Sequence, residues 1–267
     1  MRVKTTIGQY YPVESPIHNL DPRVKLISVL AFIIVLFLAN TFFSYAFIAS
    51  FLYFIIKISR VPIKFLIRGI QSLKYIIIFT MLVNIIFGLG DRIIFSIGIF
   101  NIYFEAIELA IKITIRFILL IISSSMLTLT TSPIALTGAI ESLLSPFKKI
   151  NMPVHEISMM MTIALRFIPT LMEETDKITK AQMSRGADFE QGRITQRVKS
   201  LIPILVPLFV SAFRRADELA MAMDARCYRG DVNRTKLKEL SYEKKDIFAF
   251  IIMFIFVAIV FFMSFFI

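Results

Sequence analysis

The sequence predicts an all-α polytopic membrane protein with about five transmembrane helices and a cytoplasmic helical domain whose two long helices end in arginine motifs. Its composition indicates this fold class, since 57% of the 267 residues are hydrophobic and only 18% are charged, against about 25% charged in soluble domains. Long apolar runs with few charges are the second indication. The net charge of +11 would suit a nucleic-acid binder, but such proteins lack long Ile, Leu and Phe runs. We therefore expect contact with the lipid bilayer and no nucleic-acid partner.

Five segments approach the roughly 20 apolar residues that a transmembrane helix needs. The first two are short and form a hairpin joined at Asn40 and Thr41, which suits a tightly packed pair. The predicted spans are residues 26–39, 42–58, 70–89, 104–130 and 247–267.

The loop between the second and third spans indicates the orientation of the chain. It contains Lys57, Arg60, Lys64 and Arg68 and no acidic residue, so the positive-inside rule places it in the cytoplasm. The N-terminus is then cytoplasmic and the C-terminus extracellular. This topology predicts an N-terminal membrane domain (1–131), a cytoplasmic domain (132–245) and a C-terminal span (246–267).

The fourth predicted span carries Glu105, Glu108, Lys112 and Arg116 on one helix face. Charges inside a span can mark a solute or proton path, which would favour a stand-alone channel or an ion-coupled secondary transporter. Alternatively, Glu108 pairs with Lys112, and the two bases reach the interface or pair with a neighbouring span. We favour the second interpretation.

Prolines and glycines divide the cytoplasmic domain into helices predicted at residues 134–144, 154–185 and 195–229. The second and third helices begin apolar and end charged. The apolar stretch 201–213 is too short to span a bilayer and suits a helix at the membrane surface.

The two long cytoplasmic helices share a repeat at an offset of 41 residues. Each copy ends in an arginine at the last turn of its helix and has a glycine close behind, as is typical of a helix C-terminus. An arginine at a helix end can bind a carboxylate with two hydrogen bonds, so we expect an acidic partner surface; an ordinary cationic helix cap is the alternative. The matched positions are Asp176, Ala181 and Arg185 in the first copy and Asp217, Ala222 and Arg226 in the second.

The sequence contains no arrangement of reactive groups that would indicate an enzyme. The one cysteine, Cys227, and the two histidines, His18 and His155, lie in separate regions, which excludes a Cys/His metal cage or a nucleophilic triad built on them. The chain also lacks a Gly-x-x-x-x-Gly-Lys-[Ser/Thr] phosphate loop. We expect no catalytic residue, no bound metal and no ATP hydrolysis by this chain.

Several motifs, in order along the whole chain, resemble the transmembrane T component of energy-coupling factor (ECF) transporters, the CbiQ-like family. They are Ser15-Pro-Ile-His-Asn-Leu-Asp-Pro-Arg-Val-Lys25, Thr130-Thr-Ser-Pro133, Ala164-Leu-Arg-Phe-Ile-Pro169, Ala181-Gln-Met-Ser-Arg-Gly186, Leu201-Ile-Pro203 and Ala222-Met-Asp-Ala-Arg-Cys227.

The resemblance implies a non-catalytic subunit of an ABC-type importer in the prokaryotic plasma membrane. In this family the T component links two cytosolic ATPase subunits, identical or different, to a membrane-embedded S component that binds a vitamin or other micronutrient. ATP and Mg²⁺ are then held by the ATPases and no cofactor by this chain. The substrate is chosen by the S component and is not encoded here.

The resemblance also implies specific contact residues. The family's two Ala-Arg-Gly motifs, which dock on the ATPases, correspond to Ser184, Arg185 and Gly186 and to Ala225, Arg226 and Cys227. Cys227 replaces a glycine, so we expect Gly230 to take over the capping role. Ala181, Ala222, Asp176, Asp217 and Arg166 are expected to support these motifs. Contact with the S component is expected at Met159, Met160, Met161, Leu201, Pro203 and Pro207, although the methionines could instead fill the packing between the helices.

Overall fold

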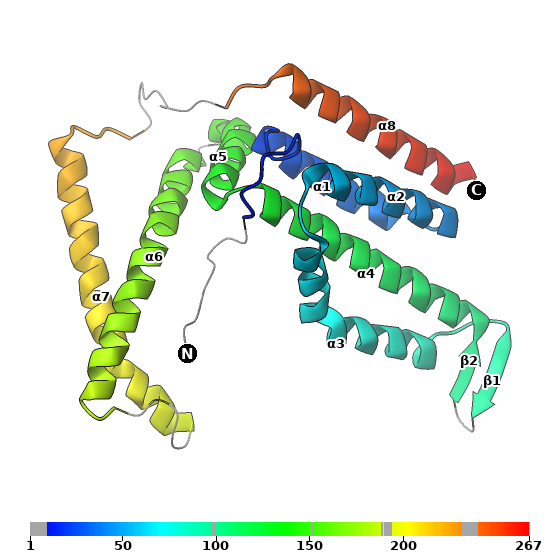
Figure 1. Cartoon of the computed structure of the whole chain (residues 1–267), viewed down its shortest axis with the longest axis horizontal. Helices are drawn as coiled ribbons and strands as arrows, with labels where there is room; N and C mark the ends of the chain where they lie inside the picture. The colour runs from blue at the N-terminus through cyan, green and yellow to red at the C-terminus, as the bar shows by residue number, and fades with distance from the viewer. Residues whose placement is uncertain are drawn as a thin grey trace. The chain divides into compact units, whose positions relative to one another are not determined.

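The computed structural model describes residues 10–97, 100–150, 152–187, 189, 194–230 and 240–266. The chain divides into two compact units: unit 1 contains residues 1–142 and 240–267, and unit 2 contains residues 143–239. Helices account for most of both (Figure 1), which confirms the predicted all-α class. The boundaries expected between membrane and cytoplasm, at 131/132 and 245/246, stay predictions.

Unit 1 begins with the predicted helical hairpin, α1 (Pro22–Leu38) and α2 (Phe42–Ser59). Asp21 caps α1, because its carboxylate accepts the Arg23 N–H at 2.8 Å and proline occupies the first helical position, where no N–H is needed. Thr41 caps α2 by accepting the Ser44 N–H at 3.4 Å. Polar caps at both starts explain how two apolar helices follow one another with almost no loop.

The next elements are α3 (Ile63–Phe87), β1 (Ile93–Ile97), β2 (Phe100–Tyr103) and α4 (Phe104–Thr130). Helix α4 has the predicted bounds, whereas α3 begins seven residues before the predicted span and so includes Lys64 and Arg68. The antiparallel pair of β1 and β2 was not predicted. Apolar runs as short as Ile93–Ile97 do not distinguish strand from helix by periodicity.

Helix α5 (Pro133–Leu144) belongs to unit 1 except for its last two residues, which begin unit 2. Unit 2 also contains the short 3₁₀ helix Ser145–Ile150 and two long helices. These are α6 (Val154–Ser184) and α7 (Ile194–Ala225), in agreement with the predicted helices to within a few residues. The chain then returns to unit 1 as α8 (Lys244–Phe266).

In the described part of the chain, three helices are long and apolar enough to cross a membrane: α2, α3 and residues Lys244–Ser264 of α8. The polytopic class is thereby confirmed. Helix α1 has only 17 residues, and α4 carries four charged residues in its first half. Spans at α1 and α4 therefore stay predictions.

The core of unit 1 joins α1, α2, α4 and α8. Leu36 of α1, Ile48 of α2 and Val260 of α8 are almost fully buried. The ring of Phe256 in α8 stacks with Phe51 of α2 at 4.0 Å between ring centroids. Helices α1 and α4 thus pack directly against two of the apolar candidate spans.

The charged residues of α4 are engaged within unit 1. Lys112 pairs with Glu108 at 2.6 Å, as predicted from their spacing. Arg116 donates to the Tyr45 hydroxyl at 2.7 Å and to the Ala39 carbonyl at 3.1 Å, so it binds the turn of the α1–α2 hairpin. Pairing of Arg116 with a neighbouring helix is confirmed, in agreement with the interpretation that we favoured.

A polar cluster at the start of α1 explains the opening motif of the sequence. Lys25, just before the first predicted span, donates from Nζ to the carbonyls of His18 and Thr130, each at 2.9 Å. Burial lowers the pKa of Lys25 to about 8. The buried Asp246 carboxylate accepts the Asp21 N–H at 2.8 Å. The cluster therefore ties together the ends of α1, α4 and α8.

Candidate functional site

The candidate site is the pair of long helices in unit 2. Helices α6 and α7 lie side by side and run antiparallel (Figure 1), since contacts near the end of one helix meet the beginning of the other. Three side-chain contacts show this order: Gln182 with the Pro203 carbonyl at 3.5 Å, Glu174 with Arg215 at 3.0 Å, and Met159 with Tyr228 at 3.1 Å. The two arginine motifs consequently lie at opposite ends of the pair.

The prolines of α7 create one of these contacts. Pro207 has no N–H, so the carbonyl of Pro203, four residues earlier, has no donor within its own helix. The side-chain amide of Gln182 in α6 donates to that carbonyl at 3.5 Å. Pro203 and Pro207 are both exposed, so their predicted contact with an S component is sterically open.

Helix α6 ends in a Schellman motif, in which two backbone N–H groups bond back to the last turn. Gly186 adopts φ +88°, and its N–H donates to the Met183 carbonyl at 3.0 Å. The N–H of the following residue, Ala187, donates to the Gln182 carbonyl at 3.0 Å. A Cβ at Gly186 would meet no atom within 4 Å, so the backbone conformation, not crowding, favours glycine here.

Helix α7 ends in the same motif at an offset of 41 residues. The Cys227 N–H donates to the Asp224 carbonyl at 2.9 Å, and the Tyr228 N–H donates to the Met223 carbonyl at 3.1 Å. Cys227 itself adopts the left-handed conformation with φ +55°. The expectation that Gly230 replaces it as the cap was therefore wrong, because the hydrogen bonds close at Cys227. The sequence repeat is thus also a structural repeat.

Arg185 and Arg226 occupy equivalent positions, each one residue before the left-handed residue of its motif. Both side chains are exposed, and neither forms an ion pair or a side-chain hydrogen bond with the residues that the structure describes. Each of the two capped helix ends therefore presents an exposed guanidinium group. The other predicted residues of these ends are also exposed: Ser184, Ala225, Ala181, Ala222, Asp176 and Asp217.

A partly open groove of about 880 Å³ lies between the first half of α6 and the end of α7. Its lining includes Arg166, predicted as a supporting residue, together with Arg226 and Arg229. Phe167 and Met223 add apolar surface. The structure thus brings Arg166 and Arg226 together and places Arg185 elsewhere, at the end of α6. Arg229 was missed because it has no counterpart in the first copy of the repeat.

Tyr228 is a second residue that the sequence did not reveal. Its hydroxyl donates to the Met159 thioether at 3.1 Å and lies 3.5 Å from Nε2 of His155. The aromatic ring therefore anchors the end of α7 to the beginning of α6. Met159 contributes to packing between the helices, as the alternative for the methionines expected, and its contact with an S component stays a prediction.

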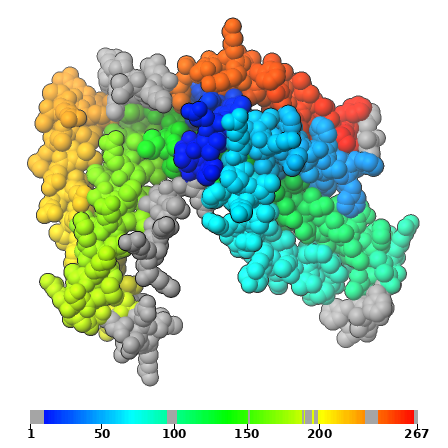
Figure 2. All heavy atoms as spheres, viewed as in Figure 1, coloured from blue at the N-terminus to red at the C-terminus, as the bar shows by residue number. Residues whose placement is uncertain are grey.

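One face of α7 is apolar and uncovered. Its exposed side chains recur every three or four residues, the spacing of a single helix face. Figure 2 shows α7, in yellow and orange, beside α6. Contiguous exposed apolar patches mark interaction surfaces. The members of this α7 apolar face are Leu201, Ile202, Leu205, Val206, Phe209, Val210 and Phe213. Met160 and Met161 of α6 are also exposed.

Comparison with known proteins finds relatives of the whole chain. The family model CbiQ, described as cobalt transport protein, matches residues 13–237. The chain is 53% identical over 246 residues to the energy-coupling factor transporter transmembrane protein EcfT of Thermosediminibacter oceani, covering 92% of each chain. It is 48% identical over 257 residues to the protein of the same name from Bacillus subtilis, covering 96% of this chain and 97% of the relative.

Proposed function

Because this chain belongs to the CbiQ family of transmembrane transport proteins, we propose that it is the coupling subunit of an ECF-type ABC importer. In this role it transmits the ATP-driven motion of two cytosolic ATPase subunits to a membrane-embedded S component that binds a vitamin or other micronutrient. The observation that carries the proposal is the duplicated helix end, with one exposed arginine on each copy. ATP and Mg²⁺ belong to the ATPases in this scheme.

The duplication supports docking on two similar partners. Each Schellman motif holds its arginine at a defined angle to its helix, and a guanidinium fork binds a carboxylate with two parallel hydrogen bonds. Since the two ends lie at opposite ends of an antiparallel pair, one ATPase subunit binds Arg185 and the other binds Arg226. The ATPase subunits can be identical or different.

The helices themselves provide the mechanical link. At about 1.5 Å per residue, helices of 31 and 32 residues are each about 46 to 48 Å long. Glu174 and Arg215 join them at 3.0 Å, and Tyr228 joins the end of α7 to Met159. Separation of the ATPase subunits therefore moves the helix ends and changes how α6 crosses α7.

The α7 apolar face is the proposed contact for the S component. Phe213 is 69% exposed and Val210 is 64% exposed, so this face gains stability by contacting another apolar surface. Together with Met160 and Met161 of α6 it provides side chains that can repack when the S component changes orientation. The N-terminus is cytoplasmic and the C-terminus extracellular in this proposal, with the complex in the prokaryotic plasma membrane.

A charge-reversing double variant tests the coupling site. Arg185→Glu with Arg226→Glu is expected to abolish co-purification of both ATPase subunits and ATP-driven uptake in proteoliposomes. The matched control is Lys149→Glu with Lys177→Glu, which makes the same change in net charge at exposed positions outside the two arginine motifs. It should retain both ATPase association and uptake. Retained association and uptake in the first variant would refute the proposal.

A further inference from the structure

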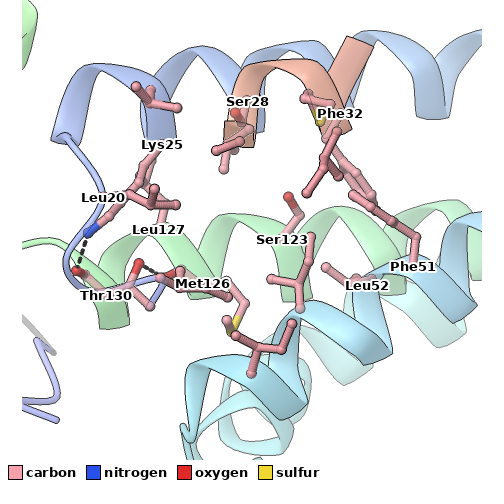
Figure 3. A pocket seen from close by; sticks show the side chains of 18 of the residues that line it. Leu20, Lys25, Ser28, Phe32, Phe51, Leu52, Ser123, Met126, Leu127 and Thr130 are labelled. Carbon is pink, nitrogen blue, oxygen red and sulfur yellow. Dashed lines mark hydrogen bonds between the residues drawn. The ribbon is translucent and has the colours of Figure 1, made fainter. Parts of the chain in front are cut away.

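Unit 1 contains a cavity of about 230 Å³ that the coupling function does not use. It lies among α1, α2, α4 and α8 and is partly open (Figure 3). Most of its wall is apolar, with Phe32 of α1, Phe51 and Leu52 of α2, Met126 of α4 and Met253 of α8. Helices α2 and α8, which form two sides, are both apolar enough to cross a membrane.

The depth of the cavity places it in one leaflet. On α1 its lining runs from Val24 to Phe32, which is about 12 Å along a helix at 1.5 Å per residue. The hydrocarbon core of a bilayer is about 30 Å thick, so the cavity extends over less than half of it. One end of the cavity lies at Lys25, which the topology predicted from the positive-inside rule places on the cytoplasmic side.

Two serine hydroxyls interrupt the apolar wall. Ser28 of α1 and Ser123 of α4 both line the cavity, and the Ser123 side chain points into it (Figure 3). Ser123 as a residue is only 3% exposed, but its hydroxyl oxygen is not among the fully buried unpaired atoms, and it forms no hydrogen bond with the described residues. Buried hydroxyl groups normally have a partner, and Thr130 on the same helix shows the usual solution by donating to the Met126 carbonyl at 2.7 Å. An acceptor that enters the cavity would satisfy Ser123.

The cytoplasmic end of α2 adds positive charge next to this space. Ile58 lines the cavity, and the nearby Lys57 and Arg60 are exposed and form no ion pair with the part of the chain that the structure describes. Basic groups at the cytoplasmic ends of transmembrane helices attract anionic lipid headgroups. An apolar cavity does not hold water stably, and the apolar material available inside a bilayer is the lipid acyl chain.

We propose that this cavity binds one acyl chain of an anionic phospholipid from the inner leaflet. The ester carbonyl at the top of the chain accepts from Ser123 and Ser28, and the phosphate lies near Lys57 and Arg60. The bound lipid fills the gap among four helices and is a structural part of unit 1.

Native mass spectrometry of the complete transporter, delipidated in mild detergent and titrated with phosphatidylglycerol, tests the proposal. Wild type should bind one tightly held lipid. Ser123→Phe fills the cavity and should weaken binding at least about tenfold, equivalent to about 1.4 kcal/mol. Ser124→Phe is the matched control, because Ser124 is the next residue on α4 and is exposed; it should bind as wild type does. Equal binding by the two variants would overturn the proposal.

A second set of variants keeps the test decisive if Ser123→Phe does not fold. Ser123→Ala leaves the space open and should weaken binding less than the phenylalanine does. Lys57→Gln with Arg60→Gln should remove the preference for phosphatidylglycerol over phosphatidylcholine without removing binding. A photoreactive residue at Leu127, which lines the cavity, should label lipid. Labelling of the S component instead would show that the cavity is a protein interface and that the proposal is wrong.

Discussion

Arg116 and Arg226 are both arginines on long helices, yet the two units use them in opposite ways. In unit 1 the Arg116 guanidinium donates to the Tyr45 hydroxyl and the Ala39 carbonyl, so its charge stabilises the helical hairpin. In unit 2 the Arg226 side chain is exposed and has no ion pair with the described residues. A charge satisfied inside the chain is structural, whereas an exposed charge without a partner in the chain is available to another protein.

The two helix ends of unit 2 offer a finer comparison. Their capping hydrogen bonds match one for one, but the residue in the left-handed conformation is Gly186 in one and Cys227 in the other. Arg226 also shares its groove with Arg166 and Arg229, whereas Arg185 is not among the residues that line this groove. The ends are therefore equivalent in backbone and different in charge density.

Single substitutions at the helix ends should have the largest effects and should separate the two ends. Removing one partner of a hydrogen-bonded charge pair at an interface costs about 2–5 kcal/mol, so we expect that loss for Arg185→Gln. Arg226→Gln should cost less, because Arg166 and Arg229 remain close to the partner's carboxylate. Binding of purified ATPase subunits to each variant measures the difference. Equal losses would mean that the groove arginines do not contribute.

The contrast between Arg116 and Arg226 predicts opposite effects on stability. Arg116→Leu leaves the Tyr45 hydroxyl and the Ala39 carbonyl without their cationic donor, which should cost about 1–3 kcal/mol and lower the melting temperature in detergent. Arg226→Leu should change stability by less than about 0.5 kcal/mol while weakening ATPase binding. Thermal unfolding of the two variants checks this, and similar melting temperatures would contradict the distinction.

The two left-handed positions predict smaller effects of opposite sign. Gly186→Ala should destabilise the end of α6 by about 1 kcal/mol, since a Cβ disfavours this conformation. Cys227→Gly should relieve the same strain in α7, with a gain below about 1 kcal/mol because glycine also increases the entropy of the unfolded chain. Hydrogen exchange at Ala187 and Tyr228, whose amides close the two motifs, reports each effect locally. Slower exchange in Gly186→Ala would refute the strain argument.

Lys25 predicts an effect of a different kind, a pH dependence of stability in unit 1. Its pKa is lowered from 10.5 to about 8, so between these values the unfolded chain binds more protons at this residue than the folded protein does. Its contribution to the free energy of unfolding should therefore increase as pH rises from about 8 to 10.5. The melting temperature of wild type relative to Lys25→Met should rise over this range. The exposed Lys57→Met is the control, and an identical profile for both variants would contradict the prediction.

Much of the fold could be predicted from local sequence. Helix α4 has the predicted bounds, and α6 and α7 begin and end within a few residues of the predicted positions, because periodicity, proline and capping residues act over one or two turns. The β1–β2 pair was missed, since strand formation depends on pairing between segments that neither run reveals alone. The early start of α3 at Ile63 was also missed, because a search for apolar spans passes over the basic turn at Lys64 and Arg68.

The parts of the candidate site that depend on residues close together in the sequence could be predicted. The repeat at an offset of 41 residues identified Arg185 and Arg226. The left-handed conformation of Cys227 was not predicted, because glycine is the residue that usually adopts this conformation. The groove with Arg166 and Arg229 and the contact of Tyr228 with Met159, 69 residues away, depend on antiparallel packing of α6 and α7. That packing is a tertiary property, which no pattern within either helix specifies.

The sequence by itself determined that the protein is helical and polytopic, where most helices lie and which two arginines close the repeated motif. These properties follow from composition and from interactions between residues close in the chain. Only the tertiary structure decided which charges are available to partners, because the groups that satisfy Arg116 lie 71 and 77 residues away along the sequence. In the described structure, no distant group forms a hydrogen bond or an ion pair with the Arg226 side chain, and this is how Arg226 differs from Arg116.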